Sequence, residues 1–104
     1  MAASGESPFE EWFDDLADGR AQERILARIA RLRLGNPGDW KALGDGVFEM
    51  RIDYGPGYRV YFGQQGFEIV VLLAGGTKST QQRDIKRAKE YWHEYQENKE
   101  TKQF

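Results

Sequence analysis

Two short runs of alternating apolar and polar residues, joined by a tight turn, constrain the fold of this chain more than any other feature. The runs cover residues 47–52 and 58–62, and the turn between them reads Asp-Tyr-Gly-Pro-Gly. Successive side chains of a strand point to opposite faces, so the pattern predicts a β-hairpin with one apolar face. That face would carry Phe48, Met50, Ile52, Tyr58, Val60 and Phe62.

The other face of the predicted hairpin is polar and carries two arginines. If the apolar faces of the two strands coincide, one register sets Arg51 opposite Tyr61 and another sets Arg51 opposite Arg59. Either register gathers two guanidinium groups and a phenol on one open face. Like charges at that separation destabilise a sheet unless they meet an anion, and the commonest polyanion is nucleic acid. Two solvated arginines on an exposed face are the simpler alternative.

The composition limits which kinds of site the chain can hold. Its 104 residues suit one domain with one core. There is no cysteine and a single histidine, His93, so we expect no disulfide, no metal site and no cofactor. The apolar run 69–74 is too short to span a membrane, and the first eight residues lack the apolar stretch of a signal peptide. We therefore expect a cytoplasmic protein without a membrane partner.

Charge is distributed unevenly along the chain. The net charge is −2, but residues 1–19 carry only acidic charges whereas residues 20–89 are predominantly basic. The total is not typical of a nucleic-acid-binding protein. A local basic face remains compatible with one.

Helical periodicity appears in three segments. In the first, 9–16, Phe9, Trp12, Phe13 and Leu16 follow the spacing of one helix face. The second, 20–34, ends at Gly35 as a C-terminal cap. Its arginines 20, 24, 28 and 31 form a basic ridge that is typical of a solvated face. Ser79 and Gln82 match a capping box, which predicts a last helix from near Thr80 to about Asn98.

A third strand is expected at 67–74, ended by Gly75, Gly76 and Thr77. Because it is apolar at nearly every position, both of its faces should be covered, which places it near the centre of the sheet. The predicted fold class is α+β: two N-terminal helices, a small mainly antiparallel sheet and a C-terminal helix, with the helices on one face. We expect a domain at 9–98 between a flexible segment at 1–8 and a flexible tail at 99–104.

Lys78 is the third basic residue singled out by its position. The sequence Gly-Gly-Thr-Lys-Ser lacks the glycine spacing of a phosphate loop. Lys78 nevertheless stands between a strand end and a helix start, where free backbone N–H groups favour an anion. His93 has no partner carboxylate in a motif and is interpreted as a surface histidine.

Three stretches together resemble a known family. Residues 40–52 (WKALGDGVFEMRI), 55–62 (GPGYRVYF) and 72–85 (LLAGGTKSTQQRDI) are similar to the RelE/ParE superfamily of type II toxins. The greatest similarity is to its HigB-like, phage-derived addiction-module killer proteins. The resemblance implies a RelE-like fold and neutralisation by a cognate antitoxin, a small helix-turn-helix protein. It also implies contact with operator DNA only through the antitoxin complex.

RelE-like members cleave mRNA on the ribosome with basic side chains and no metal, so the resemblance implies RNA and the ribosome as partners. By position it implies Arg51, Arg59 and Lys78 as catalytic and RNA-binding residues. Tyr61 is a further catalytic candidate and Arg83 a further RNA-binding one. We expect Arg59 to be the main phosphate ligand, and expect its replacement to affect stability little because it lies on a solvent face.

Glu49 stands where strongly nucleolytic relatives often place a lysine, and a carboxylate there weakens attraction for phosphate. Two alternatives therefore remain. One is a ParE-type toxin that binds DNA gyrase without nuclease activity. The other is a degenerate member that acts only by binding its antitoxin or the operator complex.

Overall fold

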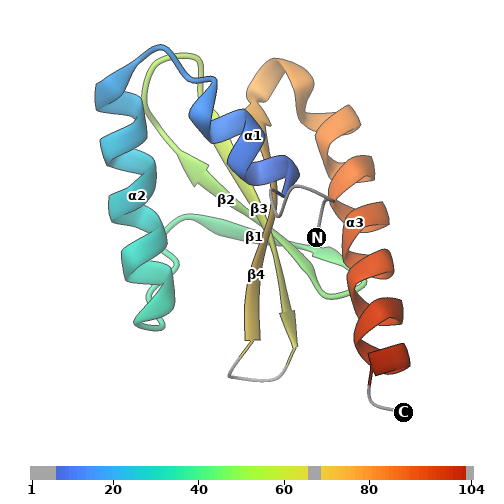
Figure 1. The fold of residues 1–104 in the computed structure, drawn as a ribbon. Coiled ribbons are helices and arrows are strands. Elements are labelled where there is room, and N and C mark those ends of the chain that lie inside the picture. Colours follow the sequence, from blue (N-terminus) through green and yellow to red (C-terminus); the bar gives the residue numbers. More distant parts are fainter. Residues whose placement is uncertain (1–6, 66–68, 103–104) are drawn as a thin grey trace.

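The structure is a computed structural model, and it describes residues 7–65 and 69–102. The elements run in the order α1 (Pro8–Asp14), α2 (Gly19–Arg33), β1 (Trp40–Gly44), β2 (Val47–Ile52), β3 (Tyr58–Gln65), β4 (Ile69–Thr77), a single 3-10 turn (Lys78–Thr80) and α3 (Gln81–Lys102). The predicted α+β class, with two N-terminal helices, an antiparallel sheet and a C-terminal helix, is confirmed (Figure 1).

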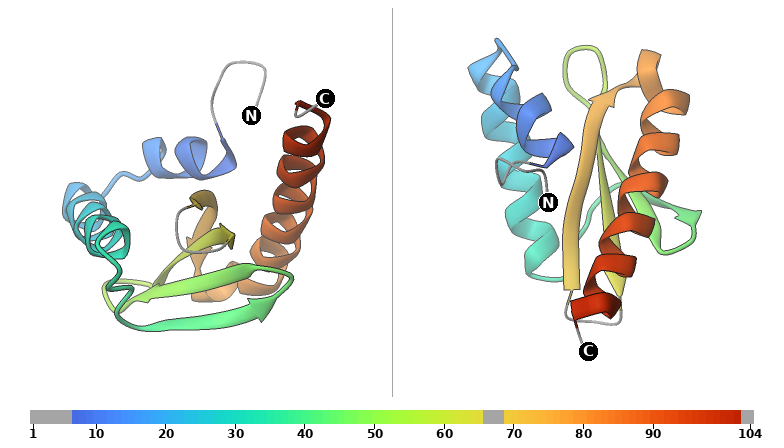
Figure 2. Two further views of the ribbon diagram at one scale, coloured as in Figure 1. Left: turned by 90° about the horizontal axis from the view of Figure 1, so that it is seen from below. Right: turned by 45° about the vertical axis from the view of Figure 1, so that its right-hand side comes forward.

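Helices cover both faces of the sheet, so the expectation that they cover one face was wrong. α1 and α2 lie on one side and α3 on the other (Figure 2). Met50, Ile52 and Val60 pack with residues of α1 and α2, whereas Tyr61 and Leu73 pack with Ala88 and Trp92 of α3. The hairpin face that the sequence pattern indicated as polar also carries two buried apolar residues, Val47 and Tyr61. It therefore needs a helix to cover it.

The sheet has the order β1-β2-β3-β4, with every neighbouring pair antiparallel. β4 is thus an edge strand, and the prediction that it lies at the centre was wrong. Its apolar character has another cause: α1 contacts one of its faces and α3 the other. Burial on both faces, which the sequence pattern did indicate, does not require a hydrogen-bonded neighbour on both sides.

β1 was not predicted as a strand. Four of its five residues are exposed, so the segment shows no apolar alternation. It pairs with β2 from Trp40 opposite Met50 to Gly44 opposite Val47, with an irregularity before Gly44. Trp40 remains about half exposed.

Gly75 and Gly76 continue β4 instead of ending it, which corrects the expected break. A Cβ atom on Gly75 would lie 2.0 Å from the Trp12 ring of α1. A Cβ on Gly76 would lie 1.8 Å from Oδ2 of Asp84 in α3. The two glycines therefore let helices approach the same strand closely from opposite faces.

The hairpin takes the register in which Arg51 faces Arg59 and Ile52 faces Tyr58. Gly55 and Gly57 in the turn adopt positive φ angles of 56° and 81°, a conformation that glycine adopts without strain. The alternative that pairs Arg51 with Tyr61 is excluded, because Tyr61 lies opposite Glu49.

The helix ends follow local capping chemistry. Ser7 and Asp18 cap α1 and α2 through their side chains. The N–H groups of Gly35 and Asn36 donate to Leu32 and Arg31 in a Schellman motif, as expected for Gly35. Before α3, the Thr77 N–H donates to Oγ1 of Thr80, so the predicted box of Ser79 and Gln82 was wrong. α3 also continues past Asn98 to Lys102.

One residue of the basic ridge on α2 is structural. Arg28 donates from Nη1 to the Arg51 carbonyl at 2.7 Å and from Nη2 to the Pro37 carbonyl at 2.9 Å. It thereby fastens α2 to β2 and to the turn before β1. Burial lowers the pKa of Arg28, which the charge of Asp39 opposes.

Candidate functional site

The predicted cluster of basic residues is built around a buried carboxylate. Oε2 of Glu49 accepts a hydrogen bond from Nε of Arg51 at 2.8 Å and another from Nη1 of Arg59 at 3.0 Å. Both arginines therefore lie on one face of the sheet and share one counter-ion. This answers how two like charges can stand directly opposite each other, since the carboxylate between them offsets their repulsion.

A glutamine from α3 completes the coordination of this carboxylate. Nε2 of Gln81, the first residue of α3, donates to Oε1 of Glu49 at 2.7 Å. The Glu49 side chain is fully buried. Burial opposes its ionisation, but the hydrogen bonds from Arg51 and Gln81 and the charge of Arg59 outweigh it, so the pKa of Glu49 is lowered. Glu49 is thus held as an anion.

The two arginines differ in access to solvent. The Arg51 side chain is 39% exposed, while that of Arg59 is 11% exposed. The expectation that Arg59 lies on a solvent face was therefore wrong, because α3 packs against β3 on the face that carries Arg59. The hydrogen bond to Glu49 raises the pKa of Arg51, which keeps it cationic.

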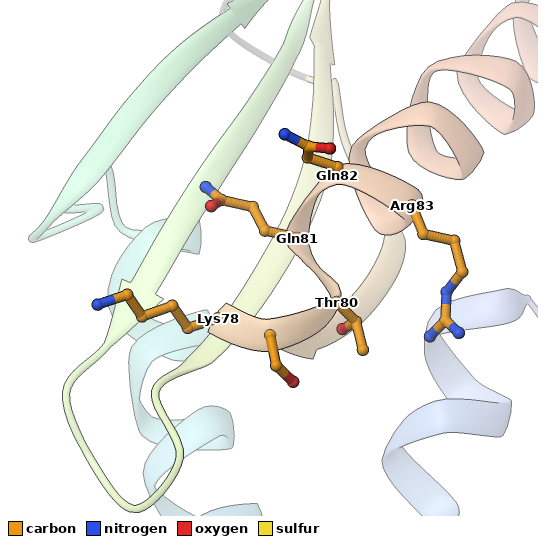
Figure 3. A pocket seen from close by; sticks show the side chains of 6 residues that line it. Lys78, Thr80, Gln81, Gln82 and Arg83 are labelled. Carbon is orange, nitrogen blue, oxygen red and sulfur yellow. The ribbon is translucent and has the colours of Figure 1, made fainter.

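Lys78 lies beside the hairpin turn. Its backbone N–H donates to the Gly57 carbonyl at 2.9 Å, and its side chain is exposed. Figure 3 shows the side chains of Lys78, in the 3-10 turn, and Gln81, at the start of α3, both extending over the sheet. The 3-10 turn and the first turn of α3 line an open pocket of about 430 Å³.

Arg83 is separated from the other predicted RNA-binding residues. Figure 3 shows its side chain pointing away from Lys78 and Gln81. It is 68% exposed, and its Nε lies 3.5 Å from Oδ1 of Asp84. The structure brings together Arg51 and Arg59, places Lys78 at the end of the next strand, and leaves Arg83 outside this group.

Tyr61 shares the sheet face with the arginines but is completely buried. Its hydroxyl finds no hydrogen-bond partner among the described residues. Burial raises the pKa of Tyr61, and the carboxylates of Glu49 and Asp84 add to the effect. The phenol is therefore kept neutral and lies beneath α3, so it has no open route to a substrate in this conformation.

Sequence reasoning did not assign roles to Gln81 and Glu49 in holding the arginines. The alternation of the hairpin did place Glu49 on their face, and this was the available signal. For Gln81 no signal existed, because its partner lies 32 positions earlier in the chain. His93 is exposed and pairs with Glu97 on its own helix, consistent with a surface role.

Two kinds of feature are absent from the described residues. No group of three or more histidine, aspartate or glutamate side chains there is arranged to hold a metal ion. Within the same residues, no helix combines the length and apolar character that crossing a membrane requires.

Comparison with known proteins places the chain in a family. It is 54% identical over 81 residues to an uncharacterized protein of Haemophilus influenzae, covering 78% of this chain and 82% of that protein. No solved structure matches. A sequence profile described as phage-derived protein Gp49-like (DUF891) matches residues 11–93. The chain therefore belongs to the phage-derived Gp49-like family, a toxin-like family related to RelE/ParE.

Proposed function

We propose that this protein is the toxin of a type II toxin–antitoxin module, and that it cleaves mRNA on the ribosome without a metal ion. The observation that carries the proposal is the pairing of Arg51 and Arg59 across β2 and β3 around one carboxylate. Lys78 adds a third cation at the end of the neighbouring strand. Membership of a phage-derived, toxin-like family supports the same function.

In the proposed reaction, a ribose 2′-oxygen of the mRNA attacks the adjacent phosphorus. The bond from phosphorus to the 5′-oxygen breaks, giving a 2′,3′-cyclic phosphate and a 5′-hydroxyl end, while water takes the proton of the 2′-hydroxyl and returns one to the 5′-oxygen. Negative charge grows on the phosphoryl oxygens in the transition state. The terminal nitrogens of Arg51 and the ammonium group of Lys78 stabilise that charge directly. Arg59 is nearly buried and adds a fixed positive charge behind them.

Arg51 is assigned the main phosphate contact because it is the more accessible arginine. Glu49 is unsuited to act as the base, since its two oxygens already accept three hydrogen bonds. Tyr61 is unsuited because its phenol is buried and its pKa is raised. The proposed acceleration therefore rests on positioning and charge, and each preorganised cation contributes roughly 2–4 kcal/mol.

The test is induction of the chain in bacterial cells, with primer extension on a reporter mRNA. We expect discrete cleavage sites and growth arrest for the natural sequence. Arg51→Ala and Lys78→Ala should each lower cleavage about 30-fold or more, the rate equivalent of losing at least about 2 kcal/mol of transition-state stabilisation. Arg33→Ala, at an exposed position on α2, is the matched control. Intact mRNA during growth arrest would contradict the nuclease function.

A ParE-type gyrase toxin is the second candidate, and specific observations favour it. Glu49 cancels one of the two arginine charges, and buried Tyr61 is unavailable as a catalyst. For this candidate, purified protein should inhibit gyrase supercoiling while mRNA stays intact. A degenerate member would do neither and would only bind its antitoxin or the operator complex.

We also propose that the stable partner is a cognate antitoxin, a small helix-turn-helix protein, and that the two proteins meet in the cytoplasm. The toxin would contact operator DNA only as part of that complex. Leu26 on α2, Leu34 directly after α2, and Trp40 on β1 are exposed large apolar side chains. With the arginines of α2 nearby, they suit an acidic amphipathic segment. Co-expression with each adjacent small gene should yield a stable complex, and failure of both to co-purify would contradict this pairing.

A further inference from the structure

The orientation of Arg51 is fixed at several points. Its backbone N–H donates to the Asp39 carbonyl at 2.9 Å, and its own carbonyl accepts from Arg28 at 2.7 Å. Its side chain donates from Nε to Glu49. Within the described part of the chain, the two terminal nitrogens of Arg51 make no hydrogen bond. The planar edge that grips an oxyanion in two places is thus left open.

Glu49 reaches Arg51 from a buried position that is itself fixed. It is two residues from Arg51 on β2, and its carboxylate is bound on one side by both arginines and on the other by Gln81. Gln81 belongs to α3, so the carboxylate also ties the helix to the sheet. Gln82, the next residue after Gln81, is exposed and lines the same pocket at the start of α3. Among the described residues it makes no hydrogen bond to Glu49.

We propose that Glu49 and Gln81 are positioning residues: the amide holds the carboxylate, and the carboxylate orients Arg51 so that its terminal nitrogens bind one phosphodiester of RNA. This inference rests on the proposed nuclease function and deepens it. It gives the carboxylate a use at a site where a negative charge alone would weaken binding. The negative charge of Glu49 lowers the attraction for RNA, but its hydrogen bond holds the guanidinium of Arg51 in one orientation.

The proposal predicts opposite effects on binding and on turnover. Glu49→Gln preserves the shape of the side chain but removes its charge. Binding of a fluorescent single-stranded RNA of about 12 nucleotides should become tighter, with a salt dependence steeper by roughly 0.7 in log–log slope. Cleavage kcat should fall about tenfold or more, because Arg51 loses its fixed orientation. A purely structural role would not tighten binding while slowing turnover.

Gln81→Ala tests the amide with a matched control, Gln82→Ala. We expect Gln81→Ala to lower kcat about tenfold while changing RNA affinity less than about twofold, since no charge is altered. Gln82→Ala should behave as the unmodified protein. Gln81→Glu should fail to rescue, because a second carboxylate cannot donate to Glu49.

Nuclear magnetic resonance of the arginine Nε–Hε groups supplies a readout independent of cleavage. The Arg51 signal should be sharp and slow to exchange in the natural sequence and in Gln82→Ala. In Gln81→Ala it should broaden or exchange faster. An unchanged Arg51 signal together with unchanged kcat in Gln81→Ala overturns the positioning role but leaves the nuclease function standing. Absence of both RNA binding and cleavage in the unmodified protein overturns the function itself, while the Arg51 signal still decides whether Gln81 orients that side chain.

Discussion

Arg59 donates from Nη1 to Oε2 of Glu49 at 3.0 Å, and Gln81 of α3 donates to the other oxygen of the same carboxylate. Glu49 is fully buried and Arg59 nearly so, which makes this an internal ion pair. Breaking such a pair from one side is costly, because it removes a counter-ion from a charge that stays buried. Arg59 therefore belongs to the fold as much as to the site.

Arg59→Ala should consequently destabilise the protein. We expect the free energy of unfolding to fall by about 3 kcal/mol, the lower end for a broken buried pair, because Glu49 keeps Arg51 and Gln81. Urea denaturation measures the change. Arg33→Ala, exposed on α2, is the control and should stay within about 0.5 kcal/mol. A loss of unfolding free energy as small as that of Arg33→Ala would show that the ion pair contributes nothing to folding. Loss of toxicity in Arg59→Ala can be assigned to the site only if the variant is folded under the conditions of the toxicity assay.

The two glycines of β4 should resist substitution. Gly75→Ala and Gly76→Ala would each place a methyl group within about 2 Å of Trp12 or Asp84. We expect each to lower the free energy of unfolding by about 1–3 kcal/mol or more. Gly19→Ala is the control, since it begins α2 and nothing lies within 4 Å of its Cβ position. Its thermal midpoint should stay the same or rise, and equal behaviour of all three variants would contradict the close approach.

Stability should depend on Glu49 in acid. Its pKa in the folded protein lies below the ordinary value of 4.5. The contribution of the carboxylate is therefore present above that value and disappears as the pH falls through the folded pKa. Urea denaturation of the unmodified protein and of Glu49→Gln should give free energies whose difference is constant above about pH 5 and shrinks as the pH falls below the ordinary value of 4.5. Glu23→Gln, exposed on α2, should track the unmodified protein, and a constant gap for Glu49→Gln would contradict an ionised Glu49.

Tyr61→Phe should be tolerated. The hydroxyl is buried without a hydrogen-bond partner among the described residues, so removing it relieves an unsatisfied polar group. We expect a gain of about 1 kcal/mol in the free energy of unfolding and unchanged growth inhibition. The control is Tyr54→Phe, at a partly exposed position of the hairpin turn. Loss of toxicity in a stable Tyr61→Phe protein would instead establish the predicted catalytic role of this phenol.

Local patterns predicted the hairpin because strand alternation and turn chemistry act over a few residues. They placed Arg51 and Arg59 on one face and left only the register open, which the structure decides in favour of direct opposition. The same patterns misplaced β4, because an apolar run records burial and not position in a sheet. They missed β1 because its residues are exposed on both faces. The bond from Gln81 to Glu49 depends on how a helix docks, which no local pattern contains.

The glycines beneath α3 have a consequence for how the length of this chain can vary. Asp84 sits against Gly76, and Trp92 sits against Gly63, where an added Cβ would lie 2.4 Å from the indole. These two contacts are eight residues apart on the helix, about 12 Å along its axis. Inserting or deleting one residue between them would turn one contact by about 100° relative to the other. Substitutions on the exposed side of this segment can accumulate, but its length cannot change without displacing either the end that holds Asp84 and Gln81 or the end that holds Trp92.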